Sequence, residues 1–318
     1  MKATLGMNYR LLATNLETMS KNLYRLREQA ATGKQMNRPS DNPSAIRPVL
    51  NYRVQSQTTD RYLDHMAVAS GELQVLDSSM DLIENLMVNA KEVALAAMNG
   101  TSSDADLRTY ADQIAQLFDE LVQASNAEVN GKFIFAGYNE ATTPFSEHPG
   151  YDPMTHDPAD PATWPVGYSG DAHVKTVEIA PEKRIQTSLA GSELFLGDAD
   201  NSGETDTGGI DLFAVLKDFE HALRTNDRAA MDSGLDQLEK GAEQVRRLRG
   251  KMGNNAWRIE RANQHLENIS LEFREILSGY EDADILTVYS DLVRQETAFE
   301  AALNVTARVS KLSILDFM

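Results

Sequence analysis

Both ends of this 318-residue chain carry helical apolar stripes, while glycines, prolines and acidic residues gather in the middle. Near the N-terminus, apolar side chains recur at steps of three and four residues, the interval at which side chains share one face of a helix. This N-terminal pattern consists of Leu12, Leu16, Met19, Leu23, Leu26 and Ala30. Because such a face needs a partner, the first segment is predicted to pack against another helix.

The last part of the chain carries apolar residues on more than one side of its predicted helix, and so predicts more than one neighbour. One line consists of Ile285, Val288 and Leu292, and a second consists of Leu286, Tyr289 and Val293. We place the function in two assembly stripes, which are Leu12, Leu16, Met19, Leu23 and Leu26 at the start and Leu292, Phe299, Leu303, Val309, Leu312 and Leu315 at the end.

The two stripes do not stabilise a fold well by themselves. Burial of six apolar side chains offsets only part of the entropy that the backbone loses when the N-terminal helix becomes ordered. Helices gain most of their stability from tertiary packing. We therefore expect the two termini to be largely disordered in the monomer and to fold when other copies supply the missing contacts.

The charge of the chain is unevenly distributed around a net value of −18. Residues 1–53 hold nine Lys or Arg against three acids, whereas residues 143–208 hold three against twelve. The acidic middle argues against nucleic acid as its ligand, because phosphate binding needs clustered cations. The absence of cysteine excludes disulfides and thiolate metal sites. No apolar run approaches the length of about 20 residues that spans a bilayer, and no cleaved signal peptide is recognisable.

Between the two ends, helical periodicity surrounds a short β-rich segment. Seven of the ten prolines lie between residues 144 and 181, where they interrupt helix. Residues 133–138 are predicted to form an aromatic strand, residues 146–165 a loop, and residues 172–180 and 183–189 a hairpin. Eight consecutive steps of three or four residues predict a coiled-coil-like seam of Met66, Ala69, Leu73, Leu76, Met80, Ile83, Met87, Ala90 and Ala94.

The predicted fold is therefore mainly α with a small β module. It is an elongated antiparallel helical bundle, with N- and C-terminal helices that pair as a coiled coil and a β-rich insertion in mid-chain. We predict three parts, which are a terminal coiled-coil assembly domain of residues 1–43 plus 284–318, a helical rod domain of residues 44–142 plus 209–283, and a β-rich outer module of residues 143–208.

No catalytic, cofactor or metal site is expected. The strongest candidate for a metal site is the segment from Asp198 to Asp206. It places oxygen ligands at positions 1, 3, 5 and 9 of a calcium-binding loop, with glycine at position 6. Its twelfth position is Gly209 instead of a bidentate glutamate, so we favour an acidic solvent-exposed turn over calcium binding. The six histidines show no i, i+3 or i, i+4 pairing, which disfavours a zinc site.

Residues 26–43 resemble the N-terminal motif of the flagellin-like family. A leucine-bearing helix runs into the Thr-Gly-Lys turn of Thr32, Gly33 and Lys34, and then into the Ser-Asp-Asn-Pro segment of residues 40–43. The order of these elements is specific to the motif. Asn42 replaces the second acid of the family's Ser-Asp-Asp-Pro segment and leaves the resemblance intact.

Further segments are similar to the branch of this family that forms the hook-filament junction. They are the glycine-bounded aromatic segment of residues 131–138 and the Thr-Pro-Phe of residues 143–145. The returning bundle helix of residues 249–260, with its Arg-Ile-Glu, and the end of the chain, residues 312–318, are similar to it as well. Trp257 stands where the family often has Asn, and the proline-rich residues 146–165 do not align. The resemblance covers nearly the whole chain, most securely residues 5–145 and 240–318.

The resemblance implies a structural subunit that is exported unfolded through the flagellar secretion channel, without a cleaved signal peptide, to an extracellular place in the flagellum. There it would act as an adaptor at the hook-filament junction. The implied partners are copies of itself in a ring, hook-associated protein 1 on the hook side, flagellin on the filament side, and an export chaperone that binds the C-terminal helix. Neither nucleic acid nor membrane insertion is implied.

Three alternatives stay open at this point. Filament flagellin is the first, although flagellins usually carry a larger mid-chain insertion rich in Ser, Thr and Asn. A helical sensory or scaffolding module, such as the periplasmic part of a receptor, is the second, and it would need membrane-spanning helices beside the bundle. An enzyme built on a helical bundle is the third, but the chain lacks a carboxylate-histidine constellation of the di-iron type.

Overall fold

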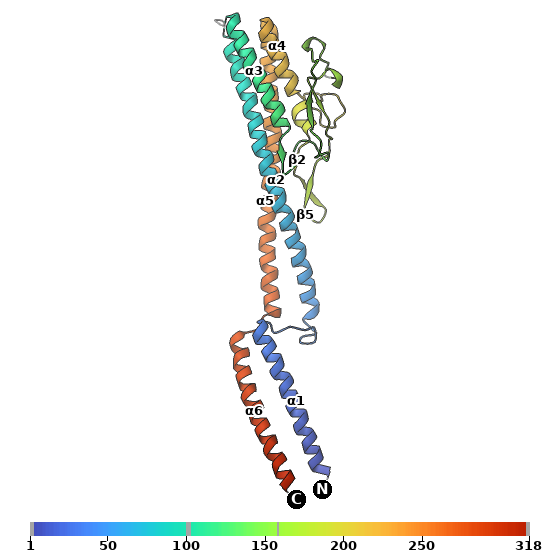
Figure 1. The fold of residues 1–318 in the computed structure, drawn as a ribbon, viewed down its shortest axis with the longest axis vertical. Coiled ribbons are helices and arrows are strands. Elements are labelled where there is room, and N and C mark those ends of the chain that lie inside the picture. Colours follow the sequence, from blue (N-terminus) through green and yellow to red (C-terminus); the bar gives the residue numbers. More distant parts are fainter. Residues whose placement is uncertain (1–2, 100–102, 158, 316–318) are drawn as a thin grey trace. The chain divides into compact units, whose positions relative to one another are not determined.

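The computed structural model describes residues 3–99, 103–157 and 159–315, and the chain divides into two compact units (Figure 1). The terminal unit comprises residues 1–60 and 267–318, and the central unit comprises residues 61–266. The terminal unit is thus built from both ends of the chain. The finer division into three parts stays a prediction.

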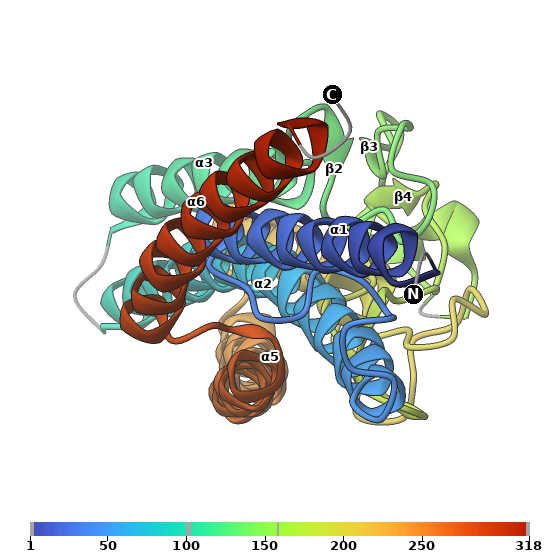
Figure 2. The ribbon, with the colours of Figure 1, turned by 90° about the horizontal axis from the view of Figure 1, so that it is seen from below.

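The terminal unit contains α1 (Ala3–Thr32), α6 (Ile285–Leu315), the beginning of α2 (Ile46–Ala97) and the end of α5 (Arg228–Glu281). Helices α1 and α6 lie side by side in both views (Figure 1 and Figure 2). Helix α1 ends at Thr32, and the next residue, Gly33, has a φ of +69°, the left-handed conformation that glycine favours at helix ends. The prolines that follow keep the chain out of helix until α2 begins, as predicted.

The central unit contains the long antiparallel pair of α2 and α5, together with α3 (Asp104–Ser125) and α4 (Leu212–Thr225). Lys91 of α2 pairs with Glu239 of α5, and Asp81 pairs with Arg249, so residue numbers rise along one helix as they fall along the other. All nine residues of the predicted seam on α2 are buried in one core cluster. The seam prediction is confirmed.

In the described residues, three antiparallel strand pairs form the β module beside these helices (Figure 1). They pair β1 (Glu128–Val129) with β2 (Lys132–Phe133), β3 (Phe145–Glu147) with β4 (Val166–Tyr168), and β5 (Thr176–Ala180) with β6 (Lys183–Gln186). The β5–β6 hairpin confirms the hairpin that was predicted around Pro181, and Glu182 completes its turn at φ +64°. The predicted loop of residues 146–165 contains the 3-10 turns η1 (Pro153–Thr155) and η2 (Pro161–Thr163).

The predicted strand of residues 133–138 is wrong beyond Phe133. The chain turns there because the Phe135 ring packs edge-on against Phe195, with ring centroids 5.2 Å apart. Gly137 then adopts φ +70°, and a Cβ at this position would lie 2.5 Å from the carbonyl oxygen of Asp171. Tertiary packing of one aromatic ring thus overrides the strand propensity of its neighbours.

A buried amide fastens the end of the β module to α5. Phe195 belongs to the π-helix η3 (Ser192–Leu196), and the chain then loops back to Ile210 before α4. Nε2 of Gln244 donates to the carbonyl oxygens of Leu194 and Ile210, both at 2.9 Å, and its Oε1 accepts from the amide of Ile210 at 3.0 Å. These bonds close the loop of residues 197–209 at its base.

Candidate assembly surface

The N-terminal assembly stripe is the inner face of α1. Leu23 is the most buried of its members, at 8% exposed, and Leu12, Leu16, Met19 and Leu26 are half-buried. Every other described residue of α1 before Leu26 is exposed. The prediction of one apolar face with a helical partner is confirmed, and the partner within the chain is α6.

The C-terminal assembly stripe is less completely covered. Leu292 and Phe299 are half-buried against α1, whereas Leu303 remains 45% exposed. Val288, which the candidate set does not include, is the most buried apolar residue of α6 among the side chains that the structure describes, at 8% exposed. Val309, Leu312 and Leu315 belong to α6, but their side chains lie outside the described residues.

In the described residues, two polar contacts join α1 and α6, one exposed and one part-buried. An ion pair joins Nη2 of Arg27 to Oε1 of Glu296 at 2.9 Å, with side chains 60% and 41% exposed. Nε2 of Gln295 donates to the backbone carbonyl of Met19 at 3.5 Å. Because exposed ion pairs contribute roughly 0 to 1 kcal/mol, apolar contact is the main attraction within this pair.

Both helices also expose apolar side chains to solvent. On α6 the second predicted line faces solvent, with Leu286, Tyr289 and Val293 exposed by 81%, 52% and 61%. On α1, Met7, Leu11 and Tyr24 are exposed by more than half. We call Leu286, Tyr289 and Val293 the outer face of α6. A contiguous exposed apolar face marks a surface that other proteins cover.

A buried carboxylate connects the turn after α1 to the end of α5. Oε2 of Glu281 accepts from Nζ of Lys34 at 2.8 Å, and its Oε1 accepts from Nε of Arg53 at 2.7 Å. The Glu281 side chain is 7% exposed. Burial acts to raise its pKa, but the bonds from Lys34 and Arg53 outweigh burial and lower the pKa below its usual value. We call this arrangement the Glu281 clip.

The backbone reinforces the Glu281 clip. The amide of Gln35 donates to the carbonyl oxygen of Glu281 at 2.8 Å, and the amide of Ala283 donates to that of Gly33 at 2.9 Å. The clip therefore fixes where α1 ends and α6 begins. Sequence reasoning did not find it, because its ion-pair partners are separated by 228 and 247 positions.

The candidate calcium loop has its first carboxylate occupied by the protein. Asp198 is buried, and its two oxygens accept from the amides of Ser202 at 3.0 Å and Gly203 at 2.9 Å. Within residues 3–99, 103–157 and 159–315, no group of three His, Cys, Asp or Glu is arranged to hold a metal ion.

Over the same residues, no helix combines the length and apolar character that crossing a bilayer requires.

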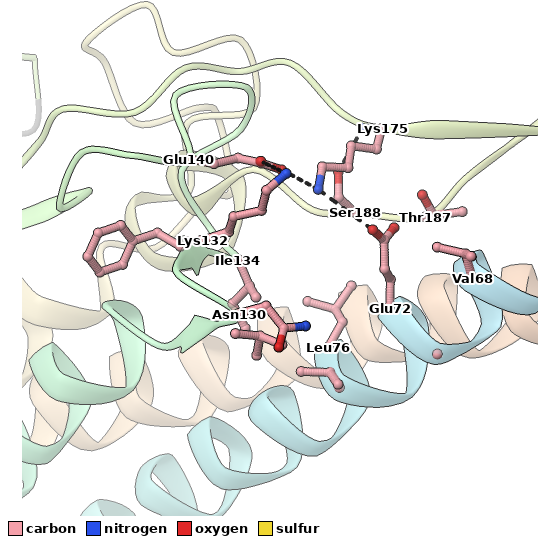
Figure 3. A pocket seen from close by; sticks show the side chains of 14 residues that line it. Val68, Glu72, Leu76, Asn130, Lys132, Ile134, Glu140, Lys175, Thr187 and Ser188 are labelled. Carbon is pink, nitrogen blue, oxygen red and sulfur yellow. Dashed lines mark hydrogen bonds and ion pairs between the residues drawn. The ribbon is translucent and has the colours of Figure 1, made fainter.

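A hollow of about 320 Å³ lies between α2 and the β module in the central unit (Figure 3). Its apolar lining includes Val68 and Leu76 from α2 and, near Leu76, Ile134. Charged side chains at its rim pair with one another: Glu140 accepts from Lys132 and Lys175, and these bonds lower the pKa of Glu140. The charges of this hollow are therefore already neutralised by the chain itself.

Comparison with known proteins gives the class of this fold. The family model of the bacterial flagellin N-terminal helical region matches residues 6–140, and that of the bacterial flagellin C-terminal helical region matches residues 235–318. These ranges contain all of α2, α3 and α6 and most of α1 and α5. The chain belongs to the bacterial flagellin family.

Individual relatives narrow the class to flagellar hook-associated proteins. The chain is 26% identical over 302 residues to flagellar hook-associated protein 3 of Escherichia coli K12, with 90% of each chain covered. The crystal structure of flagellar hook associated protein-3 from Legionella pneumophila has the same fold, with a TM-score of 0.58 and 12% identity over 73% of this chain and 99% of that one. Phase 1 flagellin of Salmonella naestved is 26% identical over only 135 residues, which are 41% of this chain and 26% of the flagellin.

Proposed function

We propose that this protein is a structural subunit of the bacterial flagellum that acts as the adaptor at the hook-filament junction and polymerises through its terminal helices. The observation that supports this most directly is the extent of the match, which covers 90% of hook-associated protein 3 but only 26% of a filament flagellin. Filament flagellin is therefore the weaker alternative.

The uncovered outer face of α6 supplies the physical reason for assembly. Leu286, Tyr289 and Val293 gain apolar burial from a further helix, because α1 covers the adjoining face of α6, about 100° around the helix, which carries Val288 and Leu292. Helices with apolar residues on two sides are suited to a layer in which each one contacts two neighbours. In this proposal the terminal part of residues 1–43 plus 284–318 makes those contacts.

The proposed partners follow from the flagellar relatives. They are further copies of the chain in a ring, hook-associated protein 1 on the hook side, flagellin on the filament side and an export chaperone at the C-terminal helix. Location in the flagellum follows from the same relatives, and export to the extracellular side without a cleaved signal belongs to the proposal. Catalysis has no part in it.

Deletion of the gene in the source bacterium tests the adaptor role. We expect cells with hooks but without filaments, and flagellin released into the medium. Complementation with the double variant Leu286→Asp and Val293→Asp should fail to restore filaments, because two carboxylates on the outer face of α6 oppose apolar burial.

Leu82→Asp is a matched control, because Leu82 is a 52% exposed leucine of α2 in the central unit. It should restore filaments. Normal filaments in the deletion strain would contradict the adaptor role. Normal filaments with the double variant would show that the outer face of α6 is not a contact surface.

A further inference from the structure

The middle of α5 presents an exposed tryptophan among cationic side chains. Trp257 is 57% exposed, and the guanidinium of Arg261, one turn later, lies over its ring with Cζ 4.6 Å from the ring centroid. Arg258, the residue after Trp257, is exposed as well. Tryptophan and arginine are enriched at the energetic centres of protein interfaces. We call Trp257, Arg258 and Arg261 the Trp257 patch.

The Trp257 patch is basic in a chain that is acidic overall. Residues 246–261 hold six Lys or Arg against one acid, whereas the whole chain has a net charge of −18. Three of these cations form ion pairs with acids of the chain, namely Arg246, Arg249 and Lys251. Within the described residues, neither Arg258 nor Arg261 forms an ion pair. The patch therefore selects an acidic partner.

The backbone of α5 is uncovered next to the patch. Gly250 and Gly253 lie on the same side of the helix as Trp257, by the 3.6-residue period. Apart from the adjacent helix backbone, no described atom lies within 4 Å of a Cβ built at either glycine. Glycine weakens a helix interior relative to alanine, and contacts within the chain do not require it here. The two glycines let the main chain of a partner approach α5 beside the patch.

A loop of the β module carries the complementary surface. Residues 147–160 hold four acids and neither a lysine nor an arginine. Met154 belongs to the 3-10 turn η1 in this loop and is 81% exposed. Three exposed aspartates lie on either side of it along the chain, namely Asp152, Asp157 and Asp160. We call Met154 and these aspartates the Met154 loop.

The Met154 loop is held in shape by hydrogen bonds. In Asp152, Asp157 and Asp160, Oδ1 accepts from the backbone amide two residues later, at 3.0 Å. Within the described residues Oδ2 of each aspartate has no partner. Nε1 of Trp164 donates to the carbonyl oxygen of Asp157 at 3.2 Å, and the hydroxyl of Tyr151 donates to Asp218 of α4 at 2.7 Å. A preorganised loop loses little conformational entropy on binding.

We propose that the Met154 loop of one copy docks on the Trp257 patch of the next copy, an inference that rests on the proposed ring of copies. Within one chain Met154 and Trp257 are both mostly exposed, so the two surfaces are free for another copy. The thioether of Met154 packs on the indole of Trp257, a favourable contact for sulfur and an aromatic ring. Arg258 and Arg261 donate to the unpartnered oxygens of the aspartates.

This contact joins two different surfaces and therefore runs head to tail from copy to copy. Head-to-tail contacts close into a ring when the rotation between copies permits it. Both surfaces belong to the central unit, so the contact adds to those of the terminal helices. Charge fixes its register, because the acidic loop is repelled by the other acidic surfaces of the neighbour.

The absence of cysteine makes disulfide cross-linking a direct test. Asn254→Cys places a thiol about one turn before Trp257, and Thr155→Cys places one next to Met154; both positions are exposed. The full-length double-cysteine chain is expressed in the deletion strain, and isolated flagella are treated with copper phenanthroline. We expect disulfide-linked copies, with a yield at least about fivefold above that of a control pair.

The control pair combines Thr155→Cys with Lys240→Cys. Lys240 is also exposed on α5, but it precedes Asn254 by a rise of about 21 Å. A thiol there lies too far from the patch to form the same disulfide. The control therefore measures cross-linking that arises from crowding alone.

Charge variants in the double-cysteine chain test both surfaces. Arg258→Glu with Arg261→Glu should lower the yield by at least about fivefold, and Asp152→Asn with Asp157→Asn should lower it in the same direction. Arg258→Lys with Arg261→Lys keeps the charge and should retain most of the yield. Asparagine keeps the turn-capping oxygen of each aspartate, and circular dichroism checks that each variant is folded.

Three results would overturn the inference. A yield at the control level, with the chain present in isolated flagella, would refute the contact and leave the adaptor role standing. Unchanged yields in both the glutamate and the asparagine variants would refute the pairing of charges on which the contact depends. Absence of the wild-type chain from isolated flagella, judged by immunoblot, would contradict the proposed function and this inference with it.

A fourth result would assign the Trp257 patch to another partner. It is a yield at the control level together with binding of the purified chain to phosphatidylglycerol vesicles that Arg258→Glu with Arg261→Glu abolishes. The patch would then bind an anionic lipid surface and not a second copy.

Discussion

Replacing Glu281 by glutamine is expected to loosen the turn after α1 while leaving the central unit intact. The variant keeps the shape of the side chain but removes the charge that holds Lys34 and Arg53. Charge-assisted hydrogen bonds contribute about 1.5 to 3 kcal/mol each. Lys34 and Arg53 are 45% and 48% exposed, so both regain hydration, and we expect a net loss of about 2 kcal/mol in local stability.

Hydrogen exchange measured by mass spectrometry gives the direct assay. The amides of Gln35 and Ala283 bridge the Glu281 clip, and a loss of about 2 kcal/mol corresponds to exchange roughly 30-fold faster at these two positions. Peptides from α3 and α4 should exchange at the wild-type rate. Glu275→Gln, at an exposed position of the same helix, serves as the control. A change under about threefold in Glu281→Gln, or an equal change in the control, would refute the reasoning.

Ser103→Ala is expected to lower the free energy of unfolding by about 1 kcal/mol, because it removes the reciprocal cap with Asp106 at the start of α3. Urea unfolding measures this loss, and an unchanged midpoint would argue against the cap. Gly137→Ala is expected to cost more, on the order of 2 to 4 kcal/mol, since its Cβ would collide with Asp171 at a left-handed φ; a wild-type melting temperature would contradict this. Burial raises the pKa of Asp211 from 3.8 to about 7, so the wild type should lose stability relative to Asp211→Asn as the pH rises from 4 to 7, by up to about 4 kcal/mol. Parallel curves of unfolding free energy against pH for the two proteins would disprove the shift.

Helical periodicity was a reliable guide to the helices because it records burial directly. Each residue of the seam from Met66 to Ala94 is buried, and the N-terminal stripe is the covered face of α1. The aromatic segment after Gly131 misled prediction, since strand propensity does not tell where a ring finds its partners. Phe135 packs against Phe195, sixty positions later, and the chain turns to allow this contact. The Asn-Gly turn at Asn130, with φ +54°, was the local signal of the β1–β2 hairpin.

For the candidate assembly surface, the sequence predicted which residues are apolar and that α6 has two faces. It could not predict that the line of Leu286, Tyr289 and Val293 would be the uncovered one, because either face of α6 could have met α1. Nor could it reveal the Glu281 clip, in which one acid among many is singled out by two distant cations. Asp211 is similar, since only the fold shows that this helix-capping acid has one buried oxygen without a partner in the described residues.

The pairing of α1 with α6 also bears on when the surface can form. Arg27 and Glu296 lie 269 positions apart, so the first helix made has no partner until the last one exists. Contacts at such separation form late in folding, because a long loop must close first. A chain truncated before residue 285 retains the central unit but offers α1 nothing to pair with. The α1–α6 pair can therefore form only after the whole chain has been synthesised, and it leaves the outer face of α6 free for a neighbour.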